Sequence, residues 1–144
     1  MLRICIVVSA LLLASSASAE YSCNKATYGS AEAAYQRGVE QQQEMNRRYE
    51  KLCLSNPDCV VFETKQPEVN ELRGVRDQAL DNYYEARDTL DWMTKNCSWK
   101  LMFSAKSFYG TVTNNISATK REFGAMEENC LWKANKIAKS WKCN

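Results

Sequence analysis

The feature that most constrains the fold is an apolar repeat with alternating spacings of three and four residues. It runs from Glu68 to Cys97, begins again after Trp99 and continues to Cys130. Such spacing places apolar side chains along one seam of an α-helix, and two helices with matching seams bury them by packing together. Arg76 is the polar exception in the first segment. The seam residues are Val69, Leu72, Arg76, Ala79, Tyr83, Ala86, Leu90, Met93 and Cys97, then Met102, Ala105, Tyr109, Val112, Ile116, Thr119, Phe123, Met126 and Cys130.

A weaker repeat precedes these two segments, from about Ser30 to Leu54. Its seam includes Gly38 and Gln42, a residue without a side chain and a polar one, which weaken the pattern. Its other seam residues are Ala31, Tyr35, Met45, Tyr49 and Leu52. The segment is still predicted to be a helix.

The only two prolines, Pro57 and Pro67, bracket the one clear interruption, predicted at 55–66. Three helices with short connections predict an all-α fold, an antiparallel three-helix bundle resembling a coiled coil. Each helix of about 30 residues would run about 45 Å.

The first nineteen residues have the pattern of a signal peptide. Arg3 precedes an almost wholly apolar run from Ile4 to Leu13, and Ala17-Ser18-Ala19 matches a cleavage site. The apolar run is shorter than the roughly 20 residues that span a bilayer. The pattern predicts a signal peptide at 1–19, a single helical domain at 20–144, and secretion to an extracellular or periplasmic compartment.

Removing the predicted signal peptide takes Cys5 with it and leaves six of the seven cysteines, all at predicted helix ends. An even number of cysteines in a secreted chain predicts three disulfides. Because Cα atoms more than about 7 Å apart cannot be bridged, cysteines at the same end of the bundle should pair. Cys23 and Cys97 are predicted at one end. The six cysteines are Cys23, Cys53, Cys59, Cys97, Cys130 and Cys143.

The other four cysteines allow two arrangements. Cys53, Cys59 and Cys130 are predicted at the opposite end of the bundle, so Cys53 and Cys59 would be shared between Cys130 and Cys143. In the alternative, Cys53 pairs with Cys59 and Cys130 with Cys143. In either arrangement the disulfides would stabilise a bundle whose seams contain few Leu or Ile residues.

The composition favours a non-catalytic protein without a cofactor or metal. Histidine is absent, which removes the commonest general base and metal ligand. The five glycines are too scattered for a phosphate loop, and the Cys53–Cys59 spacing is not that of zinc ligands. Paired carboxylates can hydrolyse glycosides without histidine, so a hydrolase is the least supported alternative. The nearly neutral chain has no nucleic-acid-binding motif, and no nucleic acid partner is expected.

An acidic stripe follows one face of the second helix and is interpreted as a solvated face. Ion pairs four residues apart are expected, from Arg73 to Asp77 and from Arg87 to Asp91. The alternative is that this stripe meets a basic partner. Its residues are Asp77, Asp81, Glu85, Asp88 and Asp91.

An additional short helix is predicted between Cys130 and Cys143, with lysines on one half and apolar residues on the other. In the favoured interpretation the apolar half packs on the bundle and the lysines are solvated. Alternatively, these lysines and Trp141 form an interaction face for an anionic membrane surface or an acidic protein groove. The lysines are Lys133, Lys136, Lys139 and Lys142.

Phe103 and Phe108 lie off the seam, and each could pack in the core or form an exposed anchor patch; Tyr83 and Tyr84 raise the same alternatives. Core packing is predicted for Phe103, Phe108, Tyr83 and Tyr84. In a eukaryotic source, two N-glycosylation patterns would also matter, and they begin at Asn96 and Asn115.

These observations predict a secreted or periplasmic binding or effector protein that acts through protein–protein contact. Its opening Cys23-Asn24-Lys25-Ala26 is similar, over four residues, to small periplasmic lysozyme-inhibitor-like domains with cysteine-stapled helices. The later cysteine and tryptophan spacings depart from that pattern, so the resemblance implies only that inhibition of an enzyme is one mode of action. The alternatives are a membrane-surface-active protein using the C-terminal helix, and a carrier of a small apolar ligand between the helices.

Overall fold

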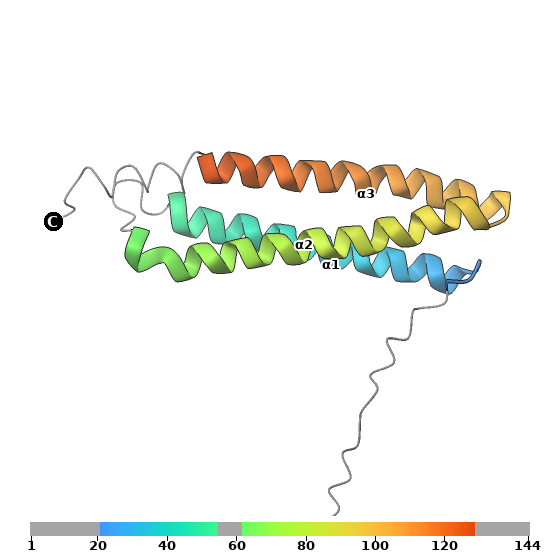
Figure 1. The fold of residues 1–144 in the computed structure, drawn as a ribbon, viewed down its shortest axis with the longest axis horizontal. Helices are drawn as coiled ribbons and strands as arrows, with labels where there is room; N and C mark the ends of the chain where they lie inside the picture. The colour runs from blue at the N-terminus through green and yellow to red at the C-terminus, as the bar shows by residue number, and fades with distance from the viewer. Residues whose placement is uncertain (1–20, 55–61, 129–144) are drawn as a thin grey trace, which may run out of the picture.

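The structure, a computed structural model, describes residues 21–54 and 62–128 (Figure 1). It contains α1 (Lys25–Tyr49), a π-helical turn η1 (Glu50–Leu54) that continues α1, α2 (Phe62–Asn96) and α3 (Trp99–Met126). Each of the three long helices runs antiparallel to the one before it (Figure 1). The prediction of an all-α three-helix bundle is therefore confirmed.

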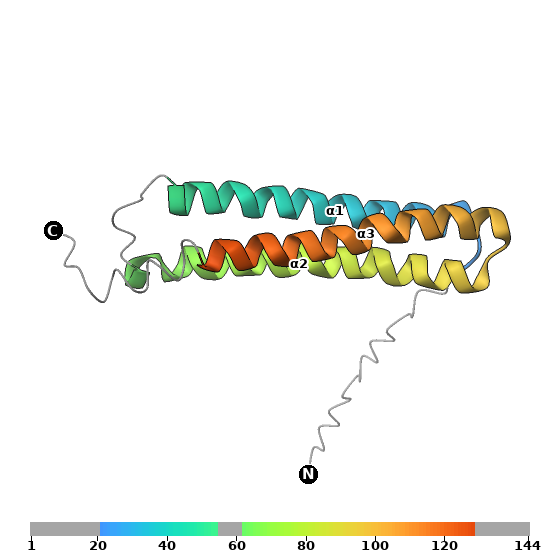
Figure 2. The same cartoon turned by 90° about the horizontal axis from the view of Figure 1, so that it is seen from above.

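Helix α2 is the common partner of the other two. Both α1 and α3 pack along it, while α1 and α3 meet each other at far fewer points (Figure 2). The core divides into two clusters along the bundle. One surrounds Tyr83, Leu90 and Val112, towards the turn between α2 and α3, and the other surrounds Met45 and Leu72 at the opposite end.

The predicted seams are the buried faces of the helices. In α2, positions 69, 72, 79, 83, 86, 90 and 93 are buried, and in α3 so are 105, 112, 116, 119, 123 and 126. The polar exception, Arg76, is not buried. Its guanidinium carbon lies 4.4 Å from the centre of the Phe123 ring, and the neighbouring Val75 is buried. Arg76 thus covers the edge of the core with a cation–π contact.

Two helix boundaries differ from the prediction. Helix α1 begins five residues early because Asn24 is its N-cap, and the Asn24 side chain accepts a hydrogen bond of 2.8 Å from the backbone N–H of Thr27. Helix α2 begins at Phe62 and contains Pro67, so 62–66 is helical and not part of the interruption. Pro67 is the sixth residue of α2, beyond the first four residues whose N–H groups lack an intrahelical acceptor, so it removes one backbone hydrogen bond from the second turn of the helix.

The two weak seam positions of α1 prove to be specific contacts. Gly38 is buried against the Tyr83 ring, so closely that a Cβ on Gly38 would lie 2.6 Å from two ring carbons. One turn further on, Gln42 accepts a hydrogen bond of 2.8 Å from the Tyr83 hydroxyl and donates one of 2.8 Å to Glu122. Gln42 therefore links all three helices.

Four predictions fall outside the described residues. They are the signal peptide at 1–19, the short C-terminal helix between Cys130 and Cys143, the interaction face of its lysines and Trp141, and the pairing of Cys59 with Cys53, Cys130 or Cys143. They stay predictions.

Candidate interaction surfaces

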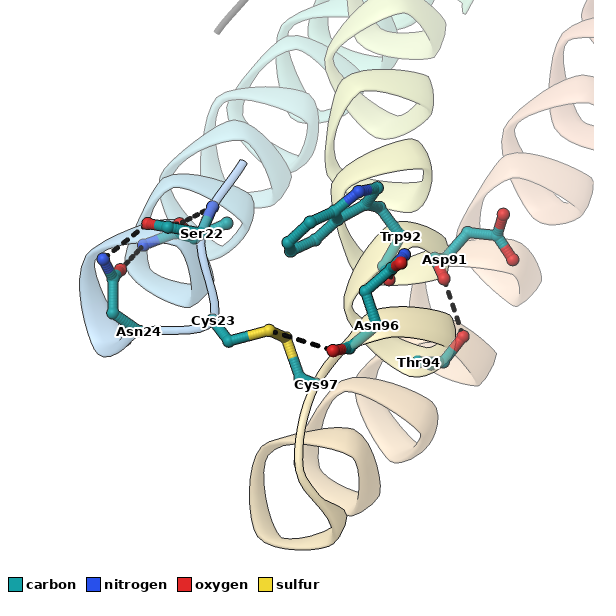
Figure 3. Close-up of a disulfide and its surroundings, with 9 residues drawn as sticks. Ser22, Cys23, Asn24, Asp91, Trp92, Thr94, Asn96 and Cys97 are labelled. Carbon is teal, nitrogen blue, oxygen red and sulfur yellow. Dashed lines mark hydrogen bonds between the residues drawn. A yellow bond between two sulfur atoms is a disulfide. The ribbon is translucent and has the colours of Figure 1, made fainter. Parts of the chain in front are cut away.

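The turn between α2 and α3 lies beside the start of α1, and a disulfide joins them. Cys23 and Cys97 are bonded with their Cα atoms 5.3 Å apart (Figure 3). This is the pairing predicted from the bundle geometry, and it is confirmed. The Cys23 sulfur lies 3.3 Å from the Asn96 carbonyl oxygen, a contact without a hydrogen bond because a disulfide sulfur carries no proton.

Cys53 is also disulfide-bonded. The described residues do not include a partner for it, because Cys59, Cys130 and Cys143 lie outside them. The choice between the two predicted arrangements at that end of the bundle therefore stays open.

The chain before α1 is held at this end by short polar contacts. The Asn24 side chain donates a hydrogen bond of 2.6 Å to the Ser22 hydroxyl, in addition to capping α1 (Figure 3). On the other side of the disulfide, the Asn96 side chain donates to the Trp92 carbonyl at 2.8 Å. The disulfide thus connects two segments, each of which is held by hydrogen bonds between its own residues.

Large exposed apolar side chains gather at this same end. Among the described residues they are Tyr21, Trp99 and Phe103, which are 38%, 71% and 60% exposed. The Tyr21 ring packs 5.5 Å from Trp92, and the Trp99 ring meets Phe103 edge-on at 5.6 Å. We call Tyr21, Trp99 and Phe103 the aromatic tip.

Exposure of Phe103 corrects the prediction that it packs in the core. Phe103 lies in the first turns of α3, about 160° around the helix from the buried seam residue Ala105, so it faces away from the buried side of the helix. The predictions for Tyr83 and Phe108 are confirmed, since Tyr83 is fully buried and Phe108 packs against the core. Tyr84 is half-buried, with the Arg87 guanidinium 4.8 Å from its ring centre.

An open groove of about 520 Å³ runs between α1 and α3 beside the aromatic tip. We call it the aromatic groove. Its Tyr28 and Phe108 rings lie 5.9 Å apart, and burial together with the nearby Glu32 carboxylate raises the pKa of Tyr28. The side chains that line the groove carry aromatic rings or hydroxyl groups, and none of them is charged. The lining consists of Tyr28, Phe103, Ser104, Ser107, Phe108 and Thr111.

The acidic stripe of α2 is neutralised mainly by local pairs, but not by the predicted ones. Arg73 pairs with Glu127 of α3 at 3.3 Å instead of Asp77, and Arg87 pairs with its neighbour Asp88 at 2.7 Å instead of Asp91. The prediction for Arg73 was wrong because it considered contacts within one helix only, and the prediction for Arg87 was wrong because the adjacent residue of the same helix is its partner. The remaining pairs are Asp77 with Arg76, Glu85 with Arg37 of α1, and Asp91 with Lys95. Exposed pairs of this kind contribute little to stability.

The two glycosylation patterns lie in different surroundings. Asn96 is exposed at the end of α2, and Ser98 beside it is exposed and makes no side-chain capping bond. Asn115 is half-buried in α3, and its side chain donates a hydrogen bond of 2.9 Å to the Tyr35 hydroxyl of α1. Glycosylation at either residue stays a prediction. The interaction face predicted at Lys133, Lys136, Lys139, Lys142 and Trp141 lies outside the described residues.

Within 21–54 and 62–128, no group of three or more Cys, Asp or Glu side chains is arranged to hold a metal ion. In the same part of the chain, no helix is both long and apolar enough to cross a membrane. Comparisons with protein-family models, curated proteins and solved structures found no match to this chain. The aromatic groove and the aromatic tip are the candidate interaction surfaces of the described residues.

Proposed function

We propose that this chain is a secreted or periplasmic, non-catalytic binding protein that acts through contact with another protein. The observation that supports this most directly is the aromatic groove. Protein interfaces are enriched in aromatic residues and depleted of charge at their centres, and the residues that line the groove combine aromatic rings with hydroxyls and include no charged side chain. A partner side chain or helix would bury Tyr28 and Phe108 further.

The walls of the groove are held in place before any partner binds. The Phe108 ring meets Tyr35 edge-on at 5.1 Å, and the Tyr35 hydroxyl accepts the hydrogen bond from Asn115. These contacts tie α1 to α3 directly beneath the groove. Because little side-chain freedom is left to lose, docking would carry a smaller entropic cost.

Secretion is part of the proposal. The Cys23–Cys97 disulfide is typical of chains that fold in an oxidising compartment, and the leader pattern of residues 1–19 agrees with it. We further propose that the mature domain, 20–144, contains three disulfides and a short C-terminal helix. Inhibition of an enzyme is one way in which a rigid protein of this kind acts.

The test is affinity capture from extracellular or periplasmic extract with the oxidised chain, followed by a binding measurement with the purified partner. Ser107→Arg places a long cation in the groove at an exposed position of α3. Ser117→Arg is the matched control, because it makes the same change at an exposed position of the same helix outside the groove.

The proposal predicts that Ser107→Arg weakens partner binding at least about tenfold, the size expected at an interface centre. Ser117→Arg should bind like the unmodified chain, and a reduced and alkylated chain should lose binding. Equal affinity of the two arginine variants would refute the assignment to the groove. Turnover of a substrate by the purified chain would refute the non-catalytic function.

A further inference from the structure

The end of the bundle that holds the Cys23–Cys97 disulfide has an unbalanced charge. Segments 21–31 and 92–121 contain cations but no aspartate or glutamate. Lys95 pairs with Asp91 of the neighbouring helical turn at 2.6 Å, whereas Lys25, Lys100 and Lys106 are exposed and form no ion pair within the described part of the chain. At the disulfide end the cations are Lys25, Lys95, Lys100 and Lys106, whereas Lys120 and Arg121 lie in the last turns of α3, towards the opposite end.

The aromatic tip lies among these lysines. Lys100 follows Trp99 directly in the first turn of α3, and Lys25 lies two residues after Cys23, which is bonded to Cys97. The disulfide thus brings Tyr21 and Lys25 from the start of the chain to the same end as Trp99, Lys100 and Phe103. The three large exposed apolar residues of the described chain therefore all lie in the segments that contain no aspartate or glutamate.

We propose that the aromatic tip and its lysines dock this protein onto an anionic lipid surface. Tryptophan and tyrosine favour the headgroup region of a bilayer because one part of the ring is apolar and another is polar. Lysines beside them are attracted by anionic headgroups. This inference goes beyond protein binding, since the partner is a membrane and the contact uses the end of the bundle.

A lipid surface fits these residues better than an acidic protein does. The exposed rings come from two chain segments, the residues before α1 and the first turns of α3. Both α1 and α3 begin at the same end of the bundle (Figure 1). A protein would need a shaped pocket for each ring, whereas a headgroup layer adapts to them. Phe103 belongs to both the aromatic tip and the aromatic groove. With the tip in the headgroups, Ser107 and Thr111 lie about one and two turns further along α3, so that part of the groove can still bind a protein.

The test measures co-flotation of the oxidised chain with phosphatidylcholine vesicles that contain or lack phosphatidylserine. The chain should float with the phosphatidylserine vesicles, and Trp99→Ser combined with Phe103→Ser should weaken that binding at least about tenfold. Lys100→Gln should weaken it about fivefold, as expected for one cation near an anionic surface. Circular dichroism checks that the variants stay helical.

Two controls separate the tip from other sources of binding. Lys51→Gln removes the same charge at an exposed position near the opposite end of α1 and should leave flotation unchanged. Replacing Lys133, Lys136, Lys139 and Lys142 by glutamine should leave binding dependent on Trp99 and Phe103. The proposal is overturned if the chain does not float, if the tip variant floats like the unmodified chain, or if the C-terminal variant alone abolishes binding.

Discussion

Replacing Gly38 by alanine should destabilise the bundle, although alanine is the better helix former. Gly38 lies inside α1, where alanine would by itself gain about 1 kcal/mol of helix propensity. The Tyr83 ring occupies the space in which a side chain at position 38 would lie. An added Cβ would lie 2.6 Å from Tyr83 Cδ1 and Cε1 and 3.1 Å from Cγ. These are atoms in the body of a rigid, fully buried ring, so the helices or the ring must move.

The size of the effect follows from three terms. Overpacking of a core costs about 1–3 kcal/mol. Moving the ring also weakens the hydrogen bond from the Tyr83 hydroxyl to Gln42, worth about 1 kcal/mol. After the gain in helix propensity is subtracted, Gly38→Ala should lower the free energy of unfolding by about 1–3 kcal/mol.

Urea unfolding followed by circular dichroism would measure this change, with Gly74→Ala as the matched control. Gly74 is exposed within α2, and a Cβ there would meet no atom within 4 Å, so alanine should raise stability by up to about 1 kcal/mol. In a Tyr83→Leu background the cost of Gly38→Ala should shrink, since the clashing ring is gone. If Gly38→Ala matched or exceeded the unmodified chain in stability, the packing argument would be refuted.

Three further outcomes are expected. Thr119→Val should raise the free energy of unfolding by about 1 kcal/mol in the same assay, because the fully buried Thr119 hydroxyl has no hydrogen-bond partner in the described part of the chain; a loss of stability would reveal a bond the structure lacks. Burial, with a smaller effect of nearby Tyr35, raises the pKa of Tyr83 to about 12. An unfolded tyrosine ionises near pH 10, so stability should fall as pH rises from about 10 to 12, and by less in Tyr83→Phe when unfolding is compared across that range. Cys23→Ser with Cys97→Ser should cost about 4 kcal/mol, since the bond closes a sequence separation of 74 residues; a change below about 1 kcal/mol would contradict that account.

Much of the fold could be predicted from residue spacing. The repeat that includes Leu72, Leu90 and Val112 identified the buried faces of α2 and α3, since a 3–4 spacing returns to the same side of a helix. The start of α1 was missed although Asn24 and Thr27 lie at a capping distance in the sequence. Attention to capping residues would have found it.

The candidate surfaces were less predictable. Phe103 and Phe108 are both off the seam, yet one is exposed and the other packs against Tyr35. A spacing of five residues turns an α-helix by about 140°, so the two rings lie on different faces of α3, and only the Phe108 ring meets Tyr35 of α1. Likewise Arg73 forms its ion pair with Glu127, at the end of α3, and not with Asp77 of its own helix.

The sequence by itself determined that this chain forms helices, which faces they bury and that Cys23 pairs with Cys97, because helical periodicity and chain reversal are local and geometric. Only the tertiary structure decided that the Tyr83 ring fills the space beside Gly38 and that Arg73 pairs with Glu127 of α3. Those outcomes depend on the shape of the neighbouring helix at one level of the bundle. A residue's own position in a repeat contains no information about that shape.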